Sequence, residues 1–487
     1  MTFWGESQRK TTPFLGLLIS TLVLIYVIFS WWRKRADKVK FMLSIPGHGL
    51  AVLLSPFYFL LDTLFCEKIL MENAVLTSQQ NVRKQSDYKY FKANSSGIFV
   101  TNGPNWRSMR KAINPCFKTE VLSSFGGGFS YHTKVFLESL QKHAIDGDLF
   151  DVFAPVHLCT FDFICENMMG CRLDFQKKNL LHLSSNSVTA GRMIFDRMYK
   201  VLYWSDFIYS LIGMQSKLNI VTSELRVIGR EIVEQQIKRR NESKNSGCET
   251  DGTLQIFMEI LLQDLDSGNI TKDQVIEETI DMITAGSITT ATVNAWVFKL
   301  LAMRPDLQEK VYREIVEICG RREEVTIADL SGLNYLDMVI KETLRHFSVP
   351  FVGRLLTSEL IVDEKTSIPA GVVVVSTIFD LHHDPEYWSK PGEFFPEHFS
   401  PENENGRPKG VFVPFLNGPR ACPGSKYAMQ SMKFLLANTI LNFELTTDEK
   451  APMDFRKENY HNVYMLHPTS GFGVKVKNRH TGQGIDC

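Results

Sequence analysis

The chain has 487 residues, 44% of them hydrophobic, and 54 Lys and Arg residues balance 54 Asp and Glu residues. A formal net charge of zero argues against nucleic acid as a partner. The nine cysteines contain no C-x-x-C pair, which argues against a zinc cluster or a disulfide framework and fits a reducing compartment.

The N-terminal part predicts a membrane anchor. Residues 13–32 form an uncharged, mostly apolar run of 20 residues, and about 20 helical residues span a bilayer core. Five Lys and Arg residues follow between positions 33 and 40, against two at positions 9 and 10, so the positive-inside bias places the rest of the chain in the cytosol. The alternative, a cleaved signal peptide, is disfavoured because a small-x-small cleavage site is missing and the run ends in a basic cluster. We therefore expect a short lumenal segment at 1–12 and a transmembrane anchor at 13–32.

The remaining chain predicts one large domain. Residues 33–49 form a basic linker that ends in Pro46 and Gly47, and the folded domain is expected over 50–487. Helical patterns dominate, with short β-like runs only near 355–362, 371–376 and 473–476. The predicted fold class is mainly α, with a small β region.

Three helical motifs precede the most informative loop. Trp106 and Arg110 have W-x-x-x-R spacing, so they share one helix face. A helix over 271–303, about 50 Å long, opens with a capping box and closes before a proline. At its centre Gly286 costs roughly 1 kcal/mol relative to alanine, and threonines there can bond back to helix carbonyls, which predicts a groove. Further along, Glu342 and Arg345 form an i, i+3 pair that alone indicates little.

The loop at 415–424 predicts a binding site for haem iron. It contains a single cysteine, Cys422, framed by glycines, an arginine and an aromatic residue. A thiolate bound to iron favours O–O cleavage, and glycine lets the backbone approach a flat porphyrin. Apolar residues at helical spacing follow from Tyr427, so we expect Cys422 just ahead of a helix whose positive end stabilises the thiolate, with Pro423 in its opening turn. The alternative is a Gly/Pro loop holding a structural cysteine.

The pattern F-x-x-G-x-R-x-C-x-G resembles the haem-ligand motif of the cytochrome P450 superfamily. Every fixed position is filled, by Phe415, Gly418, Arg420, Cys422 and Gly424. The resemblance implies a non-covalent haem b with Cys422 as the axial ligand of the iron. It extends over essentially the whole chain after the anchor.

The centre of the long helix resembles the A-G-x-D/E-T-T motif of the same family. The match implies that Ala285 and Gly286 lie at the haem and that Thr289, with Thr290, serves proton delivery. Ile288 stands where the family has an acid, so the proton route here is expected either to use Thr289, water and another acid or to be slower. Some lipid-hydroxylating members esterify haem through a Glu at the position of Ala285, which is why we expect non-covalent haem.

The other motifs acquire roles from the resemblance. Trp106, Arg110, Arg354 and Arg420 are implied contacts of the haem propionates. Pro396–Phe399 resembles a P-E-R-F segment whose Arg joins the helical Glu and Arg in a buried triad. Here His398 replaces that Arg, and Glu342 and Arg345 are interpreted as structural supports of the cysteine loop. Arg107 and Lys111 would face the proximal side of the haem, where they could bind an acidic reductase.

The sequence looks most similar to the microsomal branch that hydroxylates fatty acids and related lipids. The implied reaction inserts one atom of O2 into an apolar small molecule (a fatty acid, a steroid-type hormone or a foreign compound such as an insecticide). Electrons would come from NADPH through a flavoprotein reductase at the endoplasmic reticulum membrane. A mostly apolar pocket is expected from residues 96–100, 195–207, 285, 349–352 and 470–472.

Two other functions stay open. A haem-thiolate isomerase or dehydratase acting on an oxygenated lipid needs neither a reductase nor a proton relay, and Ile288 favours it. The presence of Thr289 and of the basic residues Arg107 and Lys111 argues against this isomerase or dehydratase. The second alternative is a non-enzymatic haem or lipid binder.

Overall fold

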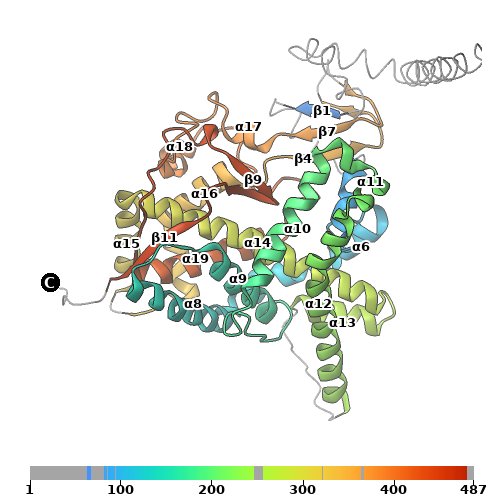
Figure 1. The fold of residues 1–487 in the computed structure, drawn as a ribbon, viewed down its shortest axis with the longest axis horizontal. Helices are drawn as coiled ribbons and strands as arrows, with labels where there is room; N and C mark the ends of the chain where they lie inside the picture. Colours follow the sequence, from blue (N-terminus) through green and yellow to red (C-terminus); the bar gives the residue numbers. More distant parts are fainter. Residues whose placement is uncertain are drawn as a thin grey trace, which may run out of the picture.

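The computed structural model describes residues 63–66, 82–84, 86–93, 95–245, 256–320, 322–362 and 367–479. These residues form a mainly helical body with small sheets, as predicted (Figure 1). The predicted segments 1–12, 13–32 and 33–49 lie outside the described residues. Within the described residues, none of the helices combines the length and apolar character needed to cross a membrane.

The helices carry the body of the fold. They are α6 (Gly103–Ile113), α7 (Thr119–Ser123), α8 (Gly126–Asp146), α9 (Phe153–Asn167), α10 (Leu181–Tyr199), α11 (Asp206–Leu211), α12 (Met214–Asn245), α13 (Phe257–Asp266), α14 (Lys272–Met303), α15 (Pro305–Cys319), α16 (Asn334–Phe347), α17 (Ile378–His382), α18 (Pro401–Glu404) and α19 (Ser425–Asn442). Short 3-10 turns connect them: η1 (Ser86–Ala93), η2 (Asn114–Phe117), η3 (Val201–Trp204), η4 (Ile327–Ser331), η5 (Pro396–Phe399) and η6 (Phe455–Lys457).

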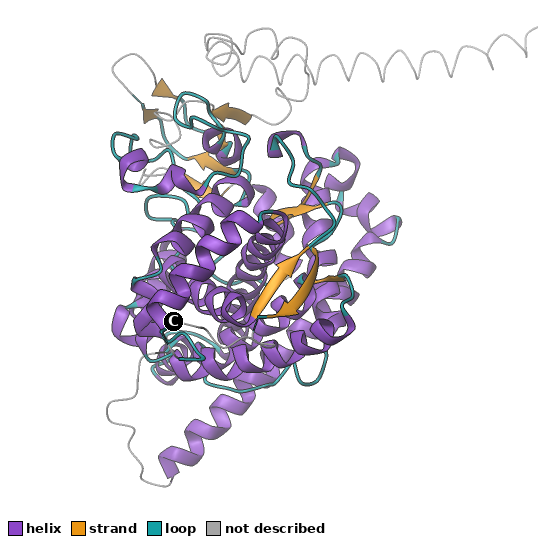
Figure 2. Ribbon diagram, turned by 90° about the vertical axis from the view of Figure 1, so that its left-hand side faces the viewer, coloured by secondary structure: helices purple, strands orange, loops and turns teal. Residues whose placement is uncertain are grey.

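The strands lie in the upper and right-hand part of the view in Figure 2. The strands are β1 (Thr63–Cys66), β2 (Val82–Lys84), β3 (Phe150–Asp151), β4 (Val352–Leu356), β5 (Leu360–Ile361), β6 (Ser367–Ile368), β7 (Val373–Ser376), β8 (Phe443–Thr446), β9 (Tyr460–Val463), β10 (Met465–Pro468) and β11 (Gly473–Asn478). One sheet has the order β1-β7-β4-β2, in which only β1 and β7 are parallel. A second has the order β3-β11-β8, and β5-β6 and β9-β10 form separate pairs. The three β-like runs of the sequence are thus confirmed, but the expectation that β structure occurs only there is wrong, since β1, β2, β3, β6, β8, β9 and β10 lie outside them.

Helix α14 is the central element of the core. It begins after Thr271, whose hydroxyl accepts the Gln274 N–H while the Gln274 side chain accepts the Thr271 N–H, so the predicted capping box is formed. Every residue from Thr290 to Ala302 is buried, because α9, α16 and α19 pack around this half. The predicted helix over 271–303 is confirmed, and its middle is exposed on one side only.

Candidate active site

The cysteine loop folds back on itself before α19. The Cys422 N–H donates to the Phe415 carbonyl at 2.8 Å, and the Ala421 N–H donates to the Gly418 carbonyl at 3.0 Å. Gly418 has a φ of 75°, in the left-handed region that glycine adopts without strain. The helix begins only at Ser425, with Gly424 as its N-cap. The expectation that Pro423 lies in the first helical turn is therefore wrong, since the first helical residue, Ser425, comes two residues later.

The Cys422 side chain is accessible, whereas Cys116, Cys159, Cys165, Cys171 and Cys319 are buried. Desolvation by the surrounding loop raises the pKa of the Cys422 thiol, and the Gly424 N–H and the Arg110 cation lower it in part. Stabilisation of the thiolate by the helix start stays a prediction.

Arg420, Arg354 and Arg110 form a cluster of cations beside this loop. The Arg420 guanidinium donates to the Thr101 carbonyl at 3.0 Å and to Asn102 Oδ1 at 2.9 Å, and it stacks over the Trp106 ring at 3.6 Å. Helix α6 therefore presents Trp106 to the cysteine loop, as the W-x-x-x-R spacing indicated. Burial, and then the neighbouring arginines, of which Arg354 is the largest contributor, lower the pKa of Arg420 to about 10.

The other members of the cluster come from α6 and β4. Arg354 is buried, and it donates to Tyr88 Oη at 3.4 Å and to the Gly353 carbonyl at 3.0 Å. Burial lowers the pKa of Arg110, while Cys422 raises it, which places Arg110 near the sulfur. In the described part of the chain, neither these arginines nor Arg420 forms an ion pair with a carboxylate. Such a cluster is suited to binding an anion.

Helix α14 presents one accessible face at its centre. Ala285 is exposed and Thr289 is partly exposed one turn later. The Thr289 hydroxyl donates to the Ala285 carbonyl at 2.7 Å, the backward bond that the sequence predicted. Thr290 is 3% exposed and packs into the core, so the two threonines lie in different surroundings.

Gly286 and Ile288 have packing roles that the motif does not show. A Cβ atom at Gly286 would lie 2.4 Å from Cδ1 of Ile164 in α9, so the glycine lets the two helices approach closely. Ile288 is 1% exposed and belongs to the hydrophobic core. The position at which the family carries an acid is therefore part of the packed interior in this chain.

Three carboxylates of α14 hold the loop that precedes α6. Glu277 accepts the N–H of Ser96, Glu278 accepts that of Ile98 at 3.0 Å, and Asp281 accepts that of Phe99 at 2.8 Å. The same loop continues to the Thr101 carbonyl that binds Arg420. The carboxylates thus connect α14 to the arginine cluster, a connection that sequence reasoning missed.

Glu278 makes the stability of the protein dependent on pH. Burial, and then Asp281, raise its pKa from 4.5 to about 8. The folded state therefore holds a proton that the unfolded state loses, and the stabilisation is lost as the pH rises from about 4.5 to about 8. Replacing Glu278 by Gln, which keeps an acceptor for the Ile98 N–H, should flatten this part of the curve in denaturant unfolding measured across pH. A curve parallel to that of the wild type would contradict this assignment.

Glu342, Arg345 and His398 form the buried triad expected from the resemblance. Arg345 donates to both oxygens of Glu342, at 2.8 and 2.9 Å, and His398 Nδ1 lies 3.2 Å from each of them. Burial opposes ionisation of Glu342, yet Arg345 and the histidine hydrogen bonds hold its pKa well below the ordinary value. His398 therefore takes the place of the second arginine in geometry.

Histidines connect this triad to the cysteine loop. The Arg345 guanidinium donates to the His382 carbonyl at 2.8 Å, and His382 Nε2 accepts the Val413 N–H at 3.0 Å. The Val413 carbonyl then accepts the Leu416 N–H at 2.9 Å, inside the loop. The adjacent histidines at 382 and 383 were visible in the sequence, but no spacing rule assigned them this role.

A cavity of about 380 Å³ lies between α10, the β9-β10 hairpin and the chain after α16. Its apolar lining includes Phe195, Pro350 and Phe351, which fall in two of the segments predicted for a substrate pocket. The hairpin residues of its lining were missed, because the pattern of the sequence does not show which strand faces the site. The lining is completed by Arg192, Asp196, Tyr460, His461, Asn462 and Leu466.

Comparisons with known proteins agree with this geometry. Residues 51–475 match the model of the family described as Cytochrome P450. The rat protein named Cytochrome P450 4V2 is 31% identical over 83% of this chain and 78% of its own length, and its human counterpart is 30% identical over 84% and 79%. Cytochrome P450 4c3 of Drosophila melanogaster is 28% identical over 98% of this chain and 96% of its own length. The chain therefore belongs to the cytochrome P450 family and is a haem-thiolate monooxygenase.

Proposed function

We propose that this monooxygenase inserts one atom of O2 into an apolar small molecule of the lipid class, with electrons from NADPH delivered by a flavoprotein reductase. The observation that carries the proposal is an accessible Cys422 thiol beside arginines that lack carboxylate partners among the described residues. The choice of substrate class follows from the resemblance of the sequence to the lipid-hydroxylating branch.

The residues present fit a haem b group. Cys422 would ligate the iron, and Arg110, Arg354, Arg420 and Trp106 would hold the propionates through charge and donated hydrogen bonds. Since these arginines lack acidic partners among the described residues, they can bind the two propionate carboxylates without breaking ion pairs. When bound, haem supplies the activation of O2 and the oxidation of the substrate. The loop residues Phe415, Gly418 and Gly424 would let the backbone approach the ring. Ala285, which is exposed on α14, would line the other side of the site without a covalent bond, whereas Gly286 packs against Ile164 of α9.

The protein contributes ligation, orientation and proton handling. Arg110 and the Gly424 N–H favour the thiolate form of Cys422, which is the form that binds metal. Thr289 is the residue we assign to proton delivery, because its hydroxyl lies on the accessible face of α14 while Thr290 lies in the core. The cavity beside α10, whose wall includes Phe195, Pro350 and Phe351, would bind the substrate.

Replacing Ile288 by Asp tests the missing acid. We expect the product formed per NADPH consumed to rise, since a protonated carboxyl group beside Thr289 would restore a proton donor. The unfolding free energy should fall at the same time, because position 288 is buried and a carboxylate there must be desolvated. Ile288→Asn, which is polar but cannot donate a carboxyl proton, is the control. If both variants couple electrons to product like the wild type, the acid is irrelevant in this enzyme.

The anchor and the reductase complete the proposal. An anchor at 13–32 would hold the enzyme at the endoplasmic reticulum membrane with its catalytic domain, 50–487, in the cytosol. Arg107 and Lys111 are exposed on α6, next to the arginine cluster, where they could bind an acidic reductase surface. The partners are then the reductase, the bilayer and the apolar substrate, without nucleic acid.

The proposal is tested by turnover with purified reductase. The full chain in vesicles should convert a lipid substrate only when NADPH, reductase and O2 are all present, with one ¹⁸O atom from labelled O2 in the product. The buried Ile288 favours one other function, that of a haem-thiolate isomerase, because such an enzyme needs no proton relay. Turnover of a lipid hydroperoxide without NADPH or reductase, and no labelled product from O2, would favour that function instead.

A further inference from the structure

The face of α14 that carries Ile288 has a polar group one turn later. Thr292 follows Ile288 by four residues, and residues at this spacing share one helix face. The Thr292 hydroxyl donates to the Ile288 carbonyl at 2.8 Å, and the side chain is fully buried. A buried hydroxyl therefore lies beside the position at which the family carries an acid.

His467 of β10 contacts this hydroxyl. Its Nε2 atom lies 2.8 Å from Thr292 Oγ1, and the residue is 6% exposed. Because the Thr292 proton is directed to the Ile288 carbonyl, Thr292 Oγ1 accepts at this contact, and His467 Nε2 carries the hydrogen. Burial, and then His157, lower the pKa of His467 to about 3. The ring is therefore neutral near pH 7, with Nδ1 as its acceptor.

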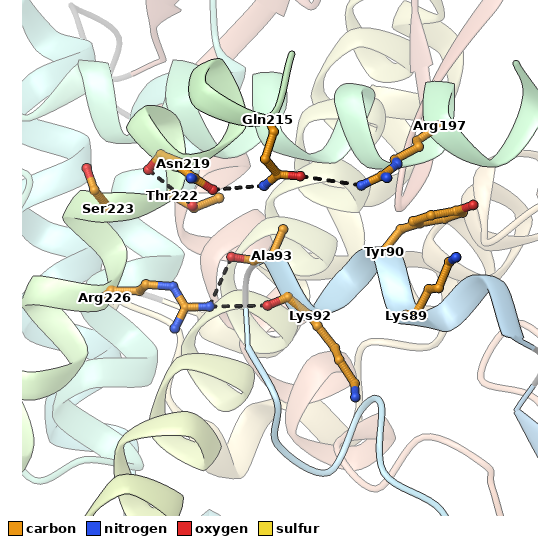
Figure 3. Close-up of a pocket in the computed structure, with 10 residues that line it drawn as sticks. All are labelled: Lys89, Tyr90, Lys92, Ala93, Arg197, Gln215, Asn219, Thr222, Ser223 and Arg226. Carbon is orange, nitrogen blue, oxygen red and sulfur yellow. Dashed lines mark hydrogen bonds between the residues drawn. The ribbon is translucent and has the colours of Figure 1, made fainter. Parts of the chain in front are cut away.

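His461 of β9 connects His467 to a cavity. The two histidines are partners in the antiparallel register of the β9-β10 hairpin, so they lie next to each other on one face of it. His461 is partly exposed and lines the cavity of about 380 Å³. A second cavity, of about 420 Å³, lies among η1, α10 and α12 (Figure 3). Its described lining contains neither a histidine nor a residue of the hairpin, so it offers no such connection.

Another histidine binds α14 without a connection to either cavity. His157 Nε2 lies 3.3 Å from Ser287 Oγ, and its Nδ1 lies 3.0 Å from Ser184 Oγ of α10. His157 is 1% exposed and is absent from the described lining of both cavities. Ser287 precedes Thr292 by five residues, which is about 140° around the helix. His157 therefore stabilises the packing of α14 on a different face.

We infer that His467 and Thr292 deliver to Thr289 the proton that an acid at position 288 would otherwise supply. The inference rests on the proposed role of Thr289 in proton delivery. Thr289 precedes Thr292 by three residues, and side chains at this spacing are neighbours about 5–6 Å apart, a gap that one water molecule spans. Both residues act through Thr289, so they are positioning residues for the reaction.

The transfer conserves charge at each step. Water of the cavity gives a proton to His467 Nδ1 by way of His461, and the Nε2 proton passes to Thr292 Oγ1. The Thr292 hydroxyl releases its own proton toward Thr289. The imidazole is neutral before and after the transfer, and a flip of the ring restores its first tautomer. One proton thus reaches Thr289 for each proton that the cavity supplies.

The state of the His467 ring is tested without turnover. The full chain with ¹⁵N-labelled histidine is studied by NMR as the reduced carbon monoxide complex, and His467→Gln assigns the signal. His467 should show a neutral ring with hydrogen on Nε2. Thr292→Val, which removes the hydroxyl at similar volume, should shift the Nε2 signal of His467 and leave that of His157 unchanged. Hydrogen on Nδ1, or an unshifted signal, would overturn the inference.

The coupling of electrons to product tests the transfer itself. His467→Gln keeps an N–H donor for Thr292 but cannot take up a proton at a second ring atom. Product formed per NADPH consumed should fall roughly tenfold, less than the roughly 100-fold that a directly acting general acid contributes. Thr292→Val should lose as much, and Thr292→Ser, which keeps the hydroxyl, should behave like the wild type.

His157→Gln is the matched control and should couple electrons like the wild type. Equal losses in His157→Gln and His467→Gln would show disturbed packing instead of a relay, and wild-type coupling in His467→Gln would equally contradict the inference. Wild-type turnover is measured first. If the wild type forms product and the variants couple like it, only the relay fails. If the wild type forms no product, the proposed function fails, while the NMR signals still test the ring.

Discussion

Replacing Glu342 by Ala is expected to lower the free energy of unfolding by about 3–5 kcal/mol, because Arg345 would remain as a buried charge without its partner. Both side chains are 0% exposed. His398 would lose its hydrogen-bond acceptor at the same time. Arg345 would no longer be held in place to donate to the His382 carbonyl, and His382 in turn binds the Val413 N–H next to the cysteine loop. The variant should therefore also bind haem poorly. Denaturant unfolding and haem content per protein measure the two effects.

Glu309→Ala is the matched control for this prediction. Glu309 also pairs with an arginine on its own helix, at 2.7 Å, but the Arg313 side chain is 78% exposed. An exposed ion pair contributes about 0–1 kcal/mol, so this variant should unfold and bind haem almost like the wild type. Equal effects of the two substitutions would show that the buried triad does not support the cysteine loop.

Replacing Cys422 by Ser is expected to abolish monooxygenation while the fold is retained. Its accessible side chain contributes little to packing, so the unfolding free energy of the apoprotein should change by less than about 0.5 kcal/mol. Activity should fall by more than the roughly 100-fold that loss of an outer-shell partner costs a metal site, because the ligand itself is removed. The assay is product formed with NADPH and reductase.

Cys319→Ser makes the same chemical change at a buried site. The Cys319 thiol donates to the Arg322 carbonyl at 3.0 Å, and a serine hydroxyl can replace that bond. This control should keep full activity. If Cys422→Ser retained activity comparable to that of the control, another residue would have to ligate the iron.

The parts of the structure that were predictable depend on local signals. Helix α14 follows from a capping box and a proline within its own sequence, and the cysteine loop follows from fixed residues within ten positions. The triad was predictable because the resemblance linked two distant motifs. In each case the sequence itself contained the whole pattern.

The unpredicted parts depend on contacts between distant segments. The sequence predicted a groove at Gly286. The space beside this glycine is filled by Ile164, which belongs to another helix. Likewise, Glu278 binds the Ile98 N–H across 180 residues, and periodicity does not reveal such pairs.

The most direct test of haem-thiolate chemistry is the difference spectrum of the reduced protein with carbon monoxide. We predict a band at roughly 450 nm in the wild type, which reports ligation of the iron by a cysteine thiolate. The band should be missing in Cys422→Ser and present in Cys319→Ser. A folded, haem-loaded wild-type protein without this band would contradict the assignment of Cys422 as the iron ligand.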